Sequence, residues 1–160
     1  PQKNLKFFLE VLRQHESFMA ALEQVDVVGV DSAEDIGMCG HEKINFVGYK
    51  KGEELSAMYY RARIVAVPSL CESFGIPALE ALYHGCDVLA SNTGALSEVL
   101  GDRGVYFSPN SRESIIQALS VALPLLAESR VLAKMPEHTS NFNWKKSASV
   151  FLSEISGVME

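Results

Sequence analysis

The chain has 160 residues, the length of one ordinary domain, because single hydrophobic cores span roughly 100–200 residues. Its hydrophobic share of 48% and charged share of 21% are globular values, and they exclude a chain that is disordered throughout. Fourteen basic against twenty acidic side chains give a net charge of −6, which argues against a dedicated nucleic-acid surface.

No apolar run approaches the roughly 18–20 residues of a membrane span, and the N-terminus does not resemble a signal peptide. The three cysteines are far apart in sequence and form no CxxC pair, so reduced thiols are expected. These features predict a cytoplasmic location.

The hydrophobic pattern predicts short apolar strands that alternate with helices. In chain order it predicts a helix over 4–22, strands over 25–30 and 44–47, a helix over 52–62, a strand over 64–67, a helix over 76–83, a strand over 87–90, a helix over 95–100, a strand over 105–107, a helix over 110–123 and a last helix from about 144. Asn110 and Glu113 have the spacing of a capping box at the start of the helix before 123. This alternation is typical of βαβ units, and it predicts an α/β protein with one doubly wound, Rossmann-like parallel sheet.

Ligands of such sheets bind beyond the carboxyl ends of the strands, so the loops between strands and helices are the places to search. Several common sites are excluded by inspection, because the chain contains no GxGxxG, GxxxxGK[ST], HExxH or GxSxG motif. Its four histidines show no metal-ligand spacing. The sequence therefore predicts no metal site.

The loop over 69–75 follows a predicted strand and opens a predicted helix. Gly75 allows a positive φ and a close backbone approach, and Pro77 suits the first turn of a helix. The backbone N–H groups of Phe74, Gly75 and Ile76 are then free to form an anion cradle at the helix N-terminus.

Glu72 and Glu80 flank this cradle, and their negative charge would repel the anion itself. They suit a ligand with an anionic middle and hydroxyl groups at both ends, which is the form of a nucleotide sugar. A purely structural interpretation is equally open, in which Glu72 caps the helix and Glu80 is a solvated helix residue.

The stretch ESFGIPALEAL resembles the E-x7-E signature of family 4 retaining glycosyltransferases of the GT-B fold, with Glu72 and Glu80 as the two acids. The segments INFVGYKKGEELSAMYYRARIVAVPSL, GCDVLASNTGALSEVLGDRGVYFSP and NFNWKKSASVFLSEI also resemble successive parts of the C-terminal domain of that family. The likeness covers nearly the whole chain.

The resemblance implies that Glu72 is the acid at the catalytic centre and binds the hydroxyl groups of the donor hexose. It implies that Glu80 binds the ribose hydroxyls, while Phe74, Gly75 and Ile76 offer backbone N–H groups to sugar and phosphate. It matches Lys3 to the lysine that neutralises the pyrophosphate, although an exposed terminal lysine is the alternative. Tyr49 is a weaker candidate for the nucleobase site, because the sequence favours a plain turn residue there.

The resemblance further implies that residues 1–160 form one donor-binding domain that lacks its own first strand and the N-terminal acceptor domain. The whole enzyme would transfer a hexose from a UDP- or GDP-sugar to a glycan or lipid-linked acceptor, without a metal or another cofactor. The fragment alone is expected to be inactive, and the whole enzyme could associate peripherally with a membrane. The alternatives are a non-catalytic nucleotide-binding module and a nucleotide-sugar epimerase of the same fold.

Overall fold

Strands and helices alternate along the chain as the hydrophobic pattern predicts. The computed structural model describes residues 2–128, 142, 143, 145–150 and 153. The strands are β1 (Val25–Val28), β2 (Ile44–Gly48), β3 (Ile64–Val67), β4 (Asp87–Ser91) and β5 (Gly104–Phe107). The α-helices among the named elements are α1 (Leu5–Gln14), α2 (Glu16–Ala21), α3 (Gly52–Arg61), α4 (Ile76–Tyr83), α5 (Leu96–Leu100) and α6 (Arg112–Ala122).

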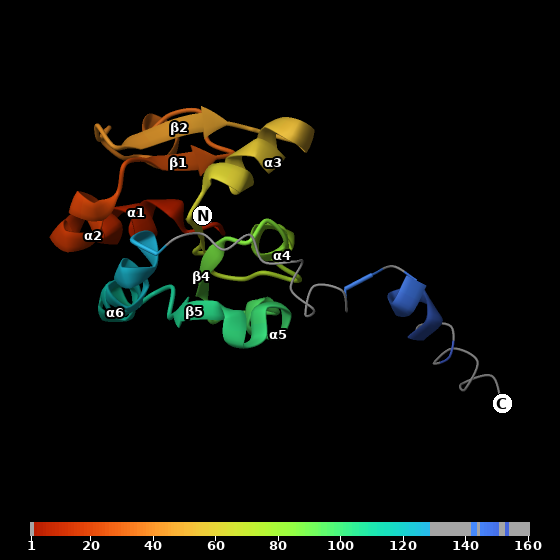
Figure 1. The fold of residues 1–160 in the computed structure, drawn as a ribbon. Helices are drawn as coiled ribbons and strands as arrows, with labels where there is room; N and C mark the ends of the chain where they lie inside the picture. The colour runs from red at the N-terminus through yellow and green to blue at the C-terminus, as the bar shows by residue number, and fades with distance from the viewer. Residues whose placement is uncertain (1, 129–141, 144, 151–152, 154–160) are drawn as a thin grey trace.

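All the pairs of named strands are parallel, which confirms the predicted α/β fold class, and these strands are divided between two sheets. One sheet pairs β1 with β2, and the other has the order β3-β4-β5. Figure 1 shows the first sheet above and the second below, with the N-terminus between them. Within the described residues, no ladder joins β1 to β3.

The predicted helix over 4–22 is divided in two at His15. This residue leaves the helical conformation, with φ −89° and ψ 82°, and its Nδ1 accepts a hydrogen bond from the N–H of Phe18 at 3.2 Å. A local cap therefore replaces one turn of helix. Both halves still bury apolar side chains, including Leu12 in α1 and Met19 in α2, so the hydrophobic spacing survives the break.

The N-cap of α6 lies one residue later than predicted. The Oγ of Ser111 accepts a hydrogen bond from the N–H of Ser114 at 3.2 Å and donates one to Glu113 at 3.1 Å. The expected capping box from Asn110 to Glu113 is therefore wrong, because the serine hydroxyl has the right offset from the first free N–H groups. Of the predicted last helix, residues 145–150 are helical, whereas Trp144 lies outside the described residues.

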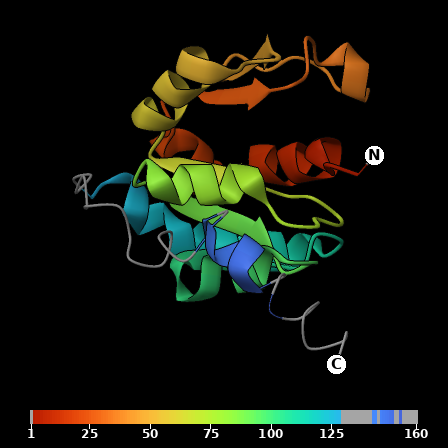
Figure 2. The same ribbon diagram turned by 90° about the vertical axis from the view of Figure 1, so that its right-hand side faces the viewer.

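Two clusters of buried side chains form the core. One joins α1, α2 and α6 to the strands through residues such as Phe8 and Phe107, whose rings stack with centroids 5.5 Å apart. The other lies between α4, α5 and the β3-β4-β5 sheet around Leu96 and Leu100. Figure 2 shows α4 against one side of the lower sheet, where it places its N-terminus beside the loops that follow the strands. Within the described ranges, no helix is both long enough and apolar enough to cross a membrane.

Candidate functional site

The loop between β3 and α4 forms the centre of the site. Gly75 caps α4 in the left-handed conformation with φ 89°, and a proline lies in the first turn, as the sequence predicts. A Cβ atom at Gly75 would lie 2.5 Å from the Cδ2 of Leu96, so glycine also permits the close approach of this loop to α5. Because α4 begins at Ile76, the N–H groups of residues 74–76 lie at its positive end.

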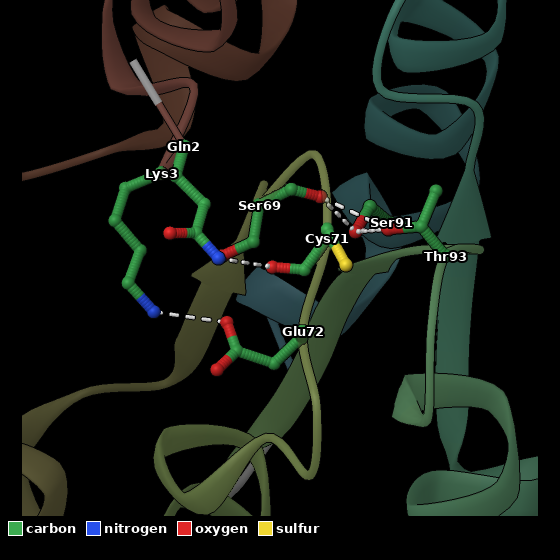
Figure 3. Close-up of polar contacts among 7 residues, drawn as sticks. All are labelled: Gln2, Lys3, Ser69, Cys71, Glu72, Ser91 and Thr93. Carbon is green, nitrogen blue, oxygen red and sulfur yellow. Dashed lines mark hydrogen bonds and ion pairs between the residues drawn. The ribbon is translucent and has the colours of Figure 1, made fainter.

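Lys3 and Glu72, which are 69 residues apart in sequence, meet in an ion pair. The Nζ of Lys3 donates to the Oε2 of Glu72 at 2.9 Å, and their side chains are 58% and 14% exposed (Figure 3). The neighbouring backbone holds this pair in place. The N–H of Leu70 donates to the carbonyl of Gln2 at 2.8 Å, and the Gln2 side chain donates to the carbonyl of Cys71 at 3.3 Å.

The electrostatic environment keeps Glu72 ionised. Partial burial by itself raises the pKa of the carboxyl, but the hydrogen bond from Lys3 and its positive charge outweigh this effect, so the pKa lies below its ordinary value. At neutral pH the carboxylate therefore accepts hydrogen bonds and donates none. The structural alternative, in which Glu72 caps α4, is not what the geometry shows, because Gly75 is the N-cap.

The loop after β4 supports the Glu72 loop from the other side. The hydroxyls of Ser91 and Thr93 both donate to the carbonyl of Ser69, at 2.6 and 3.1 Å (Figure 3). At Gly94, where φ is 59°, a Cβ atom would lie 2.1 Å from the carbonyl oxygen of Glu72. Gly94 therefore permits a backbone contact that any side chain would block.

Glu80 is held by a tyrosine that the sequence analysis did not single out. The hydroxyl of Tyr59 in α3 donates to the Oε2 of Glu80 at 3.1 Å. Burial, together with the charge of Glu80, raises the pKa of the Tyr59 hydroxyl, so it remains a donor at neutral pH. The Tyr59 ring also stacks on His84, with centroids 5.3 Å apart, which restricts its orientation.

A large cavity connects part of the predicted site. It has a volume of about 1880 Å³, and Lys3, Tyr49 and Glu80 are among the residues that line it. Tyr49 follows β2 and is 78% exposed, so it is free to contact a ligand. Among the described residues, the cavity wall includes neither Glu72 nor the cradle residues 74–76. Glu72 reaches the cavity only indirectly, through its ion pair with Lys3, which lines the wall. Phe74 is 40% and Ile76 60% exposed, so both lie at the molecular surface.

Sequence reasoning places Gly94 in a loop between a strand and a helix near the cleft, although turn chemistry alone explains a glycine there equally well. It missed Tyr59. Tyr59 gave no such signal, because its partner Glu80 is 21 residues away and belongs to another helix. Only the packing of α3 beside α4 brings them together.

Comparison with known proteins identifies relatives of known class. The chain is 42% identical over 72 residues to the O-antigen chain mannosyltransferase B of Escherichia coli, a match that covers 45% of this chain and 19% of that protein. It is 33% identical over 117 residues to the serotype-specific mannosyltransferase WbdA of Escherichia coli, covering 72% of this chain and 14% of that protein. The chain thus spans less than a fifth of the length of either relative.

A glycosyltransferase of Rickettsia africae has a similar fold. Its crystal structure matches with a TM-score of 0.71 and 18% identity, over 100% of this chain and 45% of that one. The model of the family described as "Glycosyl transferases group 1" matches residues 1–124. With three quarters of its length inside that model, the chain belongs to the family of glycosyl transferases group 1.

Proposed function

We propose that this chain binds the nucleotide-sugar donor of a retaining hexosyltransferase, with a UDP- or GDP-hexose as the donor. The observation that carries the proposal is the ion pair of Lys3 and Glu72, at 2.9 Å, next to the N-terminus of α4. A cation and a helix N-terminus side by side suit a diphosphate, and a carboxylate beside them suits sugar hydroxyls. Membership of a glycosyltransferase family supports this interpretation.

In the proposed complex, the diphosphate accepts hydrogen bonds from the N–H groups of residues 74–76 and draws the ammonium group of Lys3 towards it. Lys3 then stabilises the negative charge that develops on the departing nucleoside diphosphate, as a metal ion does in other transferases. Glu72, which loses part of its ion pair, accepts hydrogen bonds from the hexose. The mechanism therefore needs no metal ion.

The ribose binds to Glu80 in this proposal. Tyr59 occupies the Oε2 of that carboxylate and leaves Oε1 for the vicinal hydroxyls of the sugar. Tyr49 and the backbone beside it contact the nucleobase at the end of β2. The acceptor, a glycan or a lipid-linked sugar, binds to another part of the whole enzyme, which acts on the cytoplasmic side and associates peripherally with the membrane.

Calorimetric titration of the chain with UDP, GDP and their hexose derivatives tests the proposal. We expect one of these nucleotides to bind, and we expect Lys3→Ala and Glu80→Ala each to weaken binding at least tenfold, which corresponds to about 1.4 kcal/mol. Glu16→Ala serves as the control, because Glu16 is exposed in α2 and does not line the cavity. Absence of binding, or binding that is insensitive to both substitutions, would contradict the proposed donor site.

Tyr59→Phe tests the assignment of the ribose to Glu80. Loss of the hydroxyl removes the 3.1 Å hydrogen bond but keeps the ring that stacks on His84. Affinity for the ribonucleotide should fall several-fold, whereas affinity for its 2′,3′-dideoxy analogue should not change. Equal loss for both ligands would show that Glu80 does not bind the ribose.

A further inference from the structure

We propose that His84, held by Ser56, positions Tyr59 against Glu80 and so shapes the ribose end of the donor site. His84 touches no ligand in the proposed complex, so it is a positioning residue and not a binding one. The ribose role rests on the proposed function, whereas the contact of Tyr59 with Glu80 is a property of the chain itself.

The ring of His84 is oriented by the end of α4. His84 is the C-cap of this helix, and its backbone N–H donates to the carbonyl of Glu80 at 3.0 Å. Its Nδ1 lies 2.8 Å from the same carbonyl oxygen. Because a carbonyl only accepts hydrogen bonds, Nδ1 carries the proton, and in the neutral ring Nε2 is then an acceptor. The geometry of α4 therefore fixes both the direction of the ring and its tautomer.

Ser56 in α3 supplies the donor for the outer nitrogen of this ring. Its Oγ lies 2.8 Å from the Nε2 of His84, so the serine hydroxyl donates and the ring accepts. The face of the same ring stacks on Tyr59, with centroids 5.3 Å apart and 24° between the planes. His84 therefore contacts α3 at two points, through its edge and through its face.

The helix period places these contacts in two facing pairs. Ser56 and Tyr59 are one turn apart in α3 and share a face of it. Glu80 and His84 are one turn apart across the end of α4 and share a face in the same way. Figure 1 shows α3 above α4, and the hydrogen bonds join the pairs crosswise, with the serine on the histidine and the tyrosine on the glutamate.

His84 determines the direction of the Tyr59 side chain and not the place of its backbone. The backbone is anchored separately, because the Sγ of Cys86 donates to the carbonyl of Tyr59 at 3.1 Å. Tyr59 and Glu80 line the cavity of about 1880 Å³, whereas the described part of its wall includes neither Ser56 nor His84. His84 therefore acts on a ligand only through the tyrosine, by keeping its hydroxyl on the Oε2 of Glu80.

His84→Asn tests this proposal, because the shorter amide has neither an atom at the position of Nε2 nor a ring for Tyr59 to stack on. Ser56 is exposed, so Ser56→Ala removes the serine hydroxyl with little risk to folding, and Ser56→Thr restores a hydroxyl. The matched control is Ser120→Ala. The Oγ of Ser120 lies 3.1 Å from the Nε2 of His15, and neither of these residues lines the cavity.

Two measurements are made on each variant. NMR reports the tautomer of His84 and the exchange of the Tyr59 hydroxyl proton with water, and it needs no nucleotide. Calorimetric titration compares UDP or GDP with its 2′,3′-dideoxy analogue. A contact that only stabilises the fold would not change the ratio of these two affinities.

We expect Nδ1 to carry the proton in the parent chain, and we expect the Tyr59 hydroxyl to exchange faster in His84→Asn and Ser56→Ala but not in Ser56→Thr or Ser120→Ala. In His84→Asn the affinity for the ribonucleotide should fall about fivefold, the equivalent of one neutral hydrogen bond, while the affinity for the dideoxy analogue stays the same. In a chain that already carries Tyr59→Phe, His84→Asn should cause no further loss, because the two residues act as a unit.

Unchanged exchange of the Tyr59 hydroxyl in His84→Asn would overturn the proposal, whether or not a nucleotide binds. Equal loss of affinity for both nucleotides, or a loss that persists in the Tyr59→Phe chain, would also overturn it. Absence of any binding would contradict the proposed donor site and the ribose role with it. The exchange data would then still decide whether His84 positions Tyr59.

Discussion

Substitution of Gly94 by alanine should destabilise the protein more than an ordinary glycine replacement. Gly94 has φ 59°, and its added Cβ would lie 2.1 Å from the carbonyl oxygen of Glu72. The left-handed conformation costs an alanine about 1–2 kcal/mol. The overlap with the Glu72 backbone adds about 1–3 kcal/mol, the usual cost of overpacking. The free energy of unfolding should therefore fall by roughly 2–5 kcal/mol.

Gly29→Ala is the matched control for this prediction. Gly29 also has a positive φ, 86°, but a Cβ atom there would meet nothing within 4 Å. Its replacement should therefore cost only the conformational part, about 1–2 kcal/mol. Urea unfolding of both variants and the parent measures the difference, provided that the slope with denaturant concentration is unchanged.

The same pair of variants connects the stability of the loop to the site. Gly94→Ala must displace the backbone of Glu72, so it should also weaken nucleotide binding beyond the effect of Gly29→Ala. If the two replacements were equally destabilising, the close approach of Gly94 to Glu72 would not exist in solution. The role assigned here to the loop after β4 would then be wrong.

Other substitutions test the electrostatics, the cap and the core. Because the pKa of Glu72 is lowered in the folded state, its ion pair stabilises the protein above about pH 4.5, and this contribution disappears as the pH falls below that value. Urea unfolding at several pH values measures the difference in stability between the parent and Glu72→Gln. This difference should shrink as the pH falls, and a difference that does not depend on pH would contradict the role of the ion pair. Ser111→Ala removes the N-cap of α6 and should lower the free energy of unfolding by about 0.5–2 kcal/mol, whereas Asn110→Ala should leave it almost unchanged. A larger effect of Asn110→Ala would contradict this assignment and support a capping box from Asn110 to Glu113. Leu119 is fully buried in α6, so Leu119→Ala should lower the free energy of unfolding by about 2–5 kcal/mol. Val121 lies on the exposed face of the same helix, so Val121→Ala should lower it by less than about 0.5 kcal/mol. Calorimetry can measure both changes.

Local patterns were sufficient to predict most elements and the position of the site loop. β3 and α4 have the predicted bounds, because a short apolar run before a proline and a helical run after Gly75 are both local signals. The exceptions are also local in origin. At His15 and Ser111 a side chain that hydrogen-bonds to the backbone competes with the helix, and the hydrophobic period does not register such caps.

The amino-acid order alone determined the alternation of strands and helices, the glycine that opens α4, and the family to which the chain belongs. Packing decided which distant groups meet: Lys3 with Glu72 across 69 residues, and Tyr59 with Glu80 across 21. It also decided that the described strands form two parallel sheets, β1-β2 and β3-β4-β5. The physical reason is that hydrophobic periodicity reports the burial of a residue but not its partner. Contacts between distant segments depend on how every intervening element packs.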